Sequence, residues 1–442
     1  AATAAKRRTA VTSENAPLGN RENARQKQAS KTTDFTKNLW RIQRAMWETT
    51  AKKRFRDCHR APIPAAKEVT VTRSGKGGRG VFAGLQNSHS VWSSPVAAVG
   101  IAQGRQIELH DAVNNWLGGD DRRAVAMVTL TVRHRHHEDL KTLLKGVSKA
   151  WRAVSGNAKW KGAKGMRRRY GVAHSVWFLE ITHGRNGWHP HRHMVLFLDR
   201  ALDADAAAAL KAELHALWAE KVADLGLLAP NEEHGVDVQQ VTAGNTDAAG
   251  AVATYAAKGM FAGLASEATG GATKQARNGN RTPFQILEDI ADAKDAGEEP
   301  QARDVALWRE YEEATMGARQ RVWSPGAMEA LGVTALDDNA LAALEEQEPE
   351  EEPEEPTALV AIDIADWKKH LGMNIYARLE VLEAANAGDT AEAGARAVAT
   401  VLERLGVPYR RVMVKHEYLE PGPRLSADSS DVTRAEARAV LG

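Results

Sequence analysis

Cysteine is almost absent from this chain, because Cys58 is the only one among 442 residues. A single thiol cannot form an internal disulfide or a four-cysteine zinc site, so packing must hold the cores together. No apolar run approaches the length of a membrane span, and the basic N-terminal segment lacks the apolar stretch of a signal peptide. These absences predict a cytoplasmic protein with no membrane partner. The motif H-E-x-x-H is also missing, which argues against a metal-dependent peptidase.

The net charge of +2 conceals a strong local asymmetry. Residues 1–60 contain 15 Lys or Arg against 5 Asp or Glu, and residues 133–169 contain 12 against 2. Such blocks are expected for a polyanionic partner, although a solvated helix face and a disordered tail would produce the same pattern. The second block surrounds Trp160 and Tyr170, whose rings could stack on unpaired bases. Its candidate DNA-binding residues are Lys159, Lys161, Lys164, Arg167, Arg168 and Arg169.

Acidic residues concentrate in one later segment, EEQEPEEEPEEP at 345–356. A proline-broken acidic run cannot bury a core, so it predicts a solvated linker. The expected organisation has four parts: a basic, partly disordered region at 1–78, a main domain at 79–333, a linker at 334–357 and a small C-terminal module at 358–442.

Three histidines alternate in His189-Pro190-His191-Arg192-His193, just before an apolar run. Alternate residues of a β-strand share one face, so the three imidazoles would project together. A second apolar strand and a turn-rich segment precede them, and a hairpin symmetric about residues 185–186 would place Glu180 opposite His191. Two histidines and a glutamate can hold a divalent cation. The alternative is that the histidines decorate a solvent-exposed strand face.

Tyr255 and Lys258 form a Y-x-x-K pattern in an Ala-rich segment that predicts a short helix over 246–258. Residues three apart on a helix are neighbours, so both side chains would share a face. Alone, the pattern is more typical of a core tyrosine beside a solvated lysine.

Periodicity predicts a series of strands and helices through the main domain. They are strand 125–133, helix 138–154, strand 174–182, strand 190–198, helix 203–225, strand 235–241 and helix 246–258. The order βαββαβ predicts an α+β, ferredoxin-like core.

Taken together, the motifs resemble those of plasmid rolling-circle replication initiators of the HUH endonuclease superfamily, in which U is a hydrophobic residue. Thr129-Leu130-Thr131 matches the first family motif, 189–193 the second, and Tyr255 with Lys258 the third. The flanking blocks 307–311 and 323–324 also resemble initiators, most closely the single-tyrosine type of actinobacterial plasmids, over 79–333.

The resemblance implies an antiparallel sheet with one exposed active face, and cleavage of one DNA strand at the double-strand origin. Tyr255 would attack the scissile phosphorus, form a 5′-phosphotyrosyl link and free a 3′-hydroxyl primer, with Lys258 nearby. His191, His193 and Glu180 would hold Mg²⁺ or Mn²⁺, with His189 as a further candidate ligand. The implied partners are plasmid origin DNA, presented as a single-stranded or hairpin nick site, and a host helicase and polymerase.

Three positions depart from the family pattern. Arg192 replaces a bulky apolar residue, and Ala251 stands where some relatives carry a water-activating glutamate, which leaves the termination step open. Ser94 and its neighbours replace cysteines that form a zinc knuckle in relatives. A mobilisation relaxase or transposase would use the same chemistry, whereas a non-enzymatic DNA-binding repressor would explain only the basic blocks.

Overall fold

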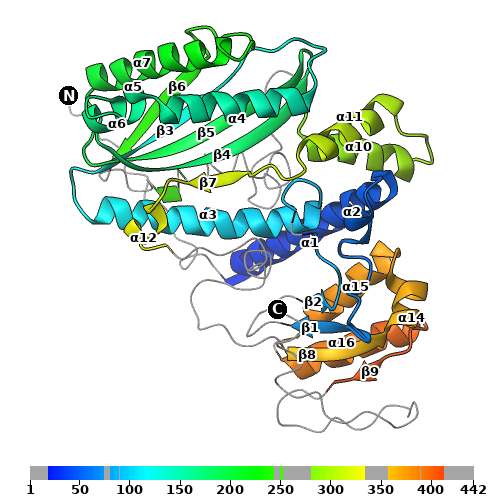
Figure 1. Cartoon of the computed structure of the whole chain (residues 1–442). Helices are drawn as coiled ribbons and strands as arrows, with labels where there is room; N and C mark the ends of the chain where they lie inside the picture. Colours follow the sequence, from blue (N-terminus) through cyan, green and yellow to red (C-terminus); the bar gives the residue numbers. More distant parts are fainter. Residues whose placement is uncertain are drawn as a thin grey trace, which may run out of the picture.

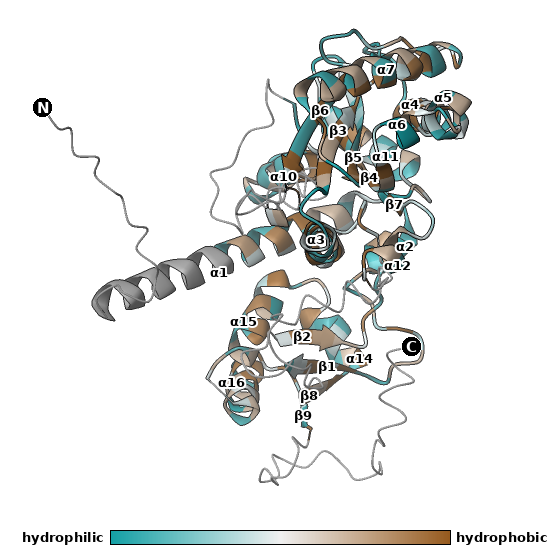
Figure 2. Cartoon of the chain, turned by 90° about the vertical axis from the view of Figure 1, so that its left-hand side faces the viewer, coloured by the Kyte–Doolittle hydropathy of each residue, from teal (hydrophilic) through white to brown (hydrophobic). Residues whose placement is uncertain are grey.

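The computed structural model describes residues 18–73, 80–88, 90–242, 249–250, 252, 280–333, 357–388 and 390–412. Over these residues the protein is an α+β fold with two antiparallel sheets, as the sequence predicts. In both views the helices α1 (Leu18–Thr49) and α3 (Pro95–Gly118) lie between the two sheets (Figure 1, Figure 2). None of the described helices is long and apolar enough to cross a membrane.

The larger sheet has five strands in the order β6-β3-β5-β4-β7. Helix α4 (Leu140–Gly156) connects β3 to β4, and α7 (Ala204–Ala223) connects β5 to β6. The first four strands and these helices form a βαββαβ unit of ferredoxin-like topology, to which β7 adds an edge strand. The strands are β3 (Ala124–Leu130), β4 (Val172–Gly184), β5 (Gly187–Leu198), β6 (Val236–Thr242) and β7 (Arg321–Trp323).

Alternation along β5 separates the two faces of this sheet. Met194, Leu196 and Leu198 pack into a core with α4 and α7, whereas Val195 and Phe197 pack into a core with α3. Figure 1 shows the same layers, with α4 and α7 on one side of the strands and α3 on the other. Short helices complete each layer: α5 (Ala158–Lys161) and α6 (Met166–Arg169) beside α4, and α12 (Ala327–Ala330) beside α3.

The predicted elements of this unit are present with shifted ends. The strand predicted at 125–133 ends at Leu130, and the strands predicted at 174–182 and 190–198 extend toward each other into a long hairpin. Of the helix predicted at 246–258, the structure describes residues 249, 250 and 252, and all three are helical.

The smaller sheet joins segments that are far apart in the sequence. Its order is β2-β1-β8-β9, and β1 pairs with β8 from Glu68 opposite Asp363 to Arg73 opposite Thr357. Val69 and Val71 are buried in its core. The sheet therefore includes strands from both sides of the predicted main domain. Its strands and helices are β1 (Glu68–Arg73), β2 (Gly80–Ala83), β8 (Thr357–Asp363), β9 (Arg410–Arg411), α14 (Ile364–Asp366), the π-helical turn Trp367–Leu371, α15 (Ile375–Ala385) and α16 (Ala391–Arg404).

A buried arginine connects this smaller module to α1. Arg378 is fully buried, and its guanidinium carbon lies 4.5 Å from the ring centre of Trp367, 4.9 Å from Trp40 and 5.4 Å from Trp47. Its Nη2 donates to the carbonyl oxygen of His59. Burial lowers the pKa of Arg378 to about 9. Aromatic faces thus stabilise a cation that joins elements from three parts of the chain.

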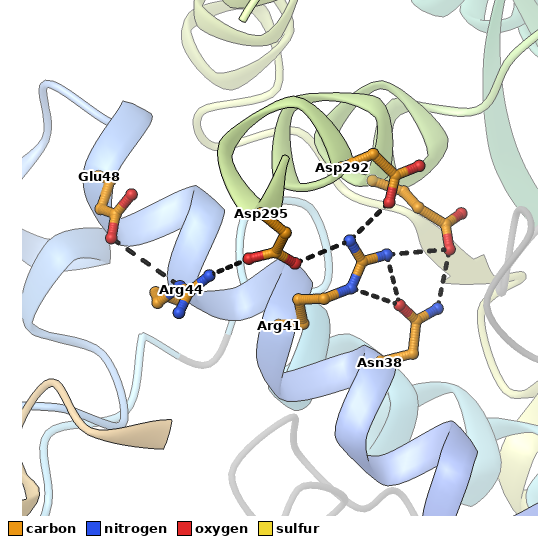
Figure 3. A network of polar contacts seen from close by, with 7 residues as sticks. Asn38, Arg41, Arg44, Glu48, Asp292 and Asp295 are labelled. Carbon is orange, nitrogen blue, oxygen red and sulfur yellow. Dashed lines mark hydrogen bonds and ion pairs between the residues drawn. The ribbon is translucent and has the colours of Figure 1, made fainter. Parts of the chain in front are cut away.

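Charged residues attach α1 to α10 (Pro283–Asp295), as Figure 3 shows. Arg41 Nη1 donates to Asp292 Oδ1 at 2.6 Å and to Asp295 Oδ2 at 3.2 Å, and Arg44 pairs with Asp295 as well. Part of the positive charge at 1–60 is therefore neutralised within the molecule. The two remaining helices of this region are α2 (Lys53–Asp57) and α11 (Ala302–Ala314).

Candidate functional site

The β4–β5 hairpin has the register that the sequence predicts. Glu180 is opposite His191, Thr182 is opposite His189 and Phe178 is opposite His193. The hairpin turn uses Gly187 at a φ of 91°, a conformation that favours glycine. All three histidines therefore share the strand face that carries Val195 and Phe197.

Two polar contacts position His193, the most buried of the three strand histidines. His193 is 9% exposed, and its Nε2 lies 2.6 Å from Glu180 Oε2. Its Nδ1 lies 3.2 Å from Thr129 Oγ1, which comes from the neighbouring strand β3. The three strands β3, β5 and β4 thus each contribute one polar group. His191 stacks beside His193, with ring centroids 6.2 Å apart.

His134 joins this cluster, although the motifs did not single it out. Its Nε2 lies 2.7 Å from His189 Nδ1, and the two rings meet edge to face with centroids 3.9 Å apart. His134 stands in a loop after β3, in the run 134–137 that contains three histidines. That run was the available signal, but a loop has no periodicity from which its side-chain directions can be predicted.

Burial keeps His189 and His191 uncharged at neutral pH. It lowers the pKa of His189 to about 4, and the nearby His134 and His191 lower it further. Burial also lowers the pKa of His191, against the opposing effect of the Glu180 carboxylate. A neutral imidazole keeps a nitrogen lone pair, which is the form that binds metal.

Glu180, His191 and His193 have the chemical groups that bind a divalent cation. Glu180 supplies carboxylate oxygens, and His191 and His193 supply imidazole nitrogens on the same face. Within the described part of the chain, no three His, Cys, Asp or Glu side chains converge closely enough to form a complete ligand cage. Glu180 and His193 instead contact each other directly, and a bound cation would have to replace that hydrogen bond.

Tyr255 and Lys258 lie outside the described residues, as do Asp247 and Ala251. The described residues of the same segment are informative, however. Ala249 is 4% exposed and Val252 is fully buried, and both belong to the core between the sheet and α3. Ala249 and Val252 therefore pack on the same sheet face as Val195 and Phe197, which is the face that carries the histidines.

The predicted DNA-binding cluster divides into paired and unpaired residues. Lys159 pairs with Glu220, and Arg169 forms a two-pronged contact with Glu213. Arg167 donates to backbone carbonyl oxygens at 172 and 173. Lys161, Lys164 and Arg168 are exposed, and their side chains make no hydrogen bond or ion pair with the described residues.

The two aromatic rings within this cluster cannot stack on bases. Trp160 is 4% exposed and packs against Trp151, and Tyr170 is 6% exposed and donates to Glu213. The sequence-based expectation of base stacking there is wrong, because the short helices α5 and α6 turn these rings into the core under α4. The cluster also lies near Asp199, which directly follows β5 and is six residues after His193. At the usual rise of a strand this places Asp199 about 20 Å from His193.

Arg192 points away from the histidines, as strand alternation predicts. It is 1% exposed, and its guanidinium carbon lies 3.7 Å from the ring centre of Trp177 and 5.6 Å from that of Trp151. Its Nε and Nη1 are buried without a hydrogen-bond partner among the described residues. Burial lowers the pKa of Arg192 to about 9. Two tryptophans thus surround the guanidinium on the sheet face opposite the histidines.

Ser94 has a structural role at the start of α3. It caps the first turn of α3 by accepting from the backbone NH of Ala97, and it donates to Gln43 Oε1 at 3.0 Å. Cys58 is fully buried nearby and accepts from the backbone NH of Ser88 at 3.2 Å. Hydrogen bonds and packing therefore hold this region.

The chain is similar to one curated protein named Protein rep, from Streptomyces lividans. The two sequences are 27% identical over 313 residues, which cover 60% of this chain and 67% of the relative. No family model matches the chain, and no solved structure matches it.

Proposed function

We propose that the protein is a plasmid replication initiator that nicks one DNA strand at an origin through Tyr255. The observation that carries the proposal is that Glu180, His191 and His193 lie on one face of the sheet beside Thr129. None of these polar side chains is part of a hydrophobic core cluster. The similarity to a protein named rep supports the same reading. The motif order supports the HUH, single-tyrosine form of this chemistry.

In the proposed reaction the Tyr255 oxygen attacks the scissile phosphorus and loses its proton. The bond from phosphorus to the 3′-oxygen breaks, and that oxygen takes up a proton to become the 3′-hydroxyl primer. The 5′-phosphate remains linked to Tyr255. A divalent cation bound by His191, His193 and Glu180 would supply Lewis-acid stabilisation of charge on the phosphate oxygens. Lys258, three residues after Tyr255, would add a positive charge on the same helix face.

The described start of the helix after β6 supports a position of Tyr255 over the histidines. Val252 is buried against the α3-side core, and Tyr255 follows it by three residues. If the helix continues, both residues lie on one helix face, toward the sheet surface that carries His193. Thr129 and Glu180 would orient His193 through its two ring nitrogens.

The first prediction concerns the covalent intermediate. We expect the protein to form a denaturant-resistant adduct with members of a labelled single-stranded DNA library in Mg²⁺ or Mn²⁺, and Tyr255→Phe to form none, because phenylalanine has no oxygen to attack phosphorus. Denaturing electrophoresis measures the adduct, and sequencing of trapped DNA identifies the nick site. Tyr376→Phe is the matched control, because Tyr376 is 57% exposed on the smaller module.

An adduct that persists in Tyr255→Phe would assign the nucleophile elsewhere. A wild-type protein that binds DNA but yields no adduct with any library member would favour the non-enzymatic repressor.

The second prediction concerns the cation. We expect Mn²⁺ to bind the full chain with about one ion per molecule, and His191→Gln to weaken that binding by about 10- to 100-fold or more, because it removes a neutral nitrogen ligand. Isothermal titration calorimetry measures this without DNA or activity. His370→Gln is the control, since His370 lies in the smaller module and its side chain makes no hydrogen bond or ion pair with the described residues. Equal Mn²⁺ affinity in both variants would remove His191 from the site.

A further inference from the structure

A second concave site lies beside the larger sheet, outside the motifs discussed above. It is a pocket of about 500 Å³ between α2, the segment before α3, and the loop that leads into β7. This size is in the range of pockets that hold small organic ligands. The lining residues that matter most here are Arg54, Trp92, Arg105, Met316, Arg319 and Gln320.

Among the described residues of the lining, five are cationic and none is acidic. Lys52 pairs with Glu313 at 2.6 Å, and Arg321 pairs with the buried Glu108. Two of the five cations therefore have carboxylate partners. Arg54 donates to the carbonyl oxygen of Ser88. Arg319 is exposed and makes no hydrogen bond or ion pair with the described residues. Arg54 and Arg319 therefore carry positive charge that no carboxylate of the described residues neutralises.

The base of the pocket is held in place by buried polar groups. Arg105 is 5% exposed, and its Nη1 donates to the side-chain oxygen of Gln320, which is 4% exposed. Trp92 Nε1 donates to the carbonyl oxygen of Ala318 at 2.8 Å, which fixes the loop against the segment before α3.

Apolar groups lie next to these cations. Phe55 and Val91 border the pocket but are only 6% and 5% exposed, so the accessible apolar surface is the side chain of Met316, which is 55% exposed on the loop that forms one wall. Single-stranded nucleic acids are bound by this combination of positive charge with apolar surface, since phosphates need the first and base faces the second. An inorganic anion alone would not need the apolar side.

The pocket adjoins the candidate site along β4. The backbone NH of Leu179 donates to the carbonyl oxygen of Gln320 at 2.8 Å, one residue before Glu180. Arg105 belongs to α3, which packs on the sheet face that carries the histidines. Neighbouring strands are ~5 Å apart and neighbouring strand residues ~3.4 Å apart, so Gln320 and the Glu180 backbone are separated by about two such steps.

We propose that this pocket binds a nucleotide of single-stranded DNA, with its phosphate on Arg54 and Arg319 and its base against the side chain of Met316. The bound strand then continues past Glu180. The placement of this strand rests on the proposed nicking function, but binding of single-stranded DNA in the pocket does not. The pocket would keep the DNA in register with the candidate site and would leave the cleavage chemistry to other residues.

The test uses a fluorescent 20-nucleotide oligo-dT and the full chain, with binding measured by anisotropy over a series of salt concentrations. Arg319→Glu is the cleanest variant, because Arg319 has no contact to lose within the described structure. We expect it to weaken binding at least tenfold. In Arg54→Ala/Arg319→Ala the slope of log affinity against log salt should fall in magnitude by about 1.4, at ~0.7 for each lost phosphate contact.

Arg396→Glu is the matched control, because Arg396 is exposed on α16 and makes no side-chain contact within the described structure. It should bind oligo-dT like the wild type. Wild-type affinity in Arg319→Glu and in the double variant would overturn the proposal. Polyglutamate that competes as well as oligo-dT would also overturn it, in favour of an acidic protein partner. Tyr255→Phe is assayed in parallel, so that a failure of the nicking function can be told apart from a failure of the pocket. If this variant loses the adduct but binds oligo-dT normally, the result bears on the nicking function alone.

Discussion

At the residue scale, His183 illustrates how burial sets a charge state. It is 7% exposed and packs edge to face on Trp188, with ring centroids 4.9 Å apart. Burial lowers the pKa of His183 to about 4, and the positive charges of Arg303 and Arg281 lower it further. The folded protein therefore resists protonation of a ring that the unfolded chain protonates near pH 6.5.

This shift predicts an acid sensitivity with a defined sign. The lowered pKa does not affect the free energy of unfolding above pH 6.5. As the pH falls from 6.5 toward 4, the free energy of unfolding decreases, because the unfolded chain binds a proton at this histidine that the folded protein does not bind. His183→Phe keeps an aromatic ring on Trp188 but cannot be protonated. Between pH 7.5 and 4.5 we expect the wild type to lose about 2 kcal/mol more free energy of unfolding than the variant, measured by urea denaturation.

His234→Phe is the control for this comparison, because the side chain of His234 is 72% exposed. Its acid loss should equal that of the wild type. Identical acid losses in all three proteins would contradict the proposed neutral state of His183.

Sequence reasoning at this scale succeeded where strand alternation fixes a direction. It predicted that His191 would face Glu180 and that Arg192 would face the opposite core. It did not find His134, whose position depends on a loop, nor the pairing of Lys159 and Arg169 with glutamates of α7. Those contacts depend on how distant elements pack, which no local pattern contains.

At the element scale, the long periodic segments were predictable and the short ones were not. The four ferredoxin-like strands and the helices α4 and α7 have strong alternation or an amphipathic stripe, and all were predicted. The three-residue strand β7 is too short for any periodicity, yet it forms the edge of the sheet and one wall of the basic pocket. The sequence could therefore predict the histidine site but not the pocket beside it.

The N-terminal basic block gives a similar lesson about elements. Its composition favours a polyanionic partner, but α10 and α11 present acidic residues to Arg41, Arg44 and Lys52. Arg54 and Arg56 are the cations of residues 34–60 that lack a carboxylate partner among the described residues. Counting charges along the sequence thus overestimates the charge available to DNA.

At the scale of the whole molecule, the pairing of β1 with β8 makes the smaller module depend on both parts of the chain. A chain that ends at Val333 would lack β8 and would expose the apolar faces of Val69 and Val71, at a cost of about 1.5–3 kcal/mol for each side chain. We expect this chain to bind the dye ANS and to associate through the open strand edge. Size-exclusion chromatography and dye fluorescence measure these effects.

A chain that ends at Val412 is the matched control, because it keeps every described strand of the sheet. It should remain dispersed and bind little dye. A dispersed, dye-free chain ending at Val333 would show that the β1–β2 hairpin is stable without β8.

The β1–β8 pairing also has a consequence for synthesis on the ribosome. At ~5–20 residues per second, the segment 357–363 leaves the tunnel about 15–60 s after 68–73. During this interval the ferredoxin-like unit can fold, while the β1–β2 hairpin still has the edge of β1 unpaired. Nascent chains should therefore be most vulnerable to premature association, and most in need of a chaperone, late in translation.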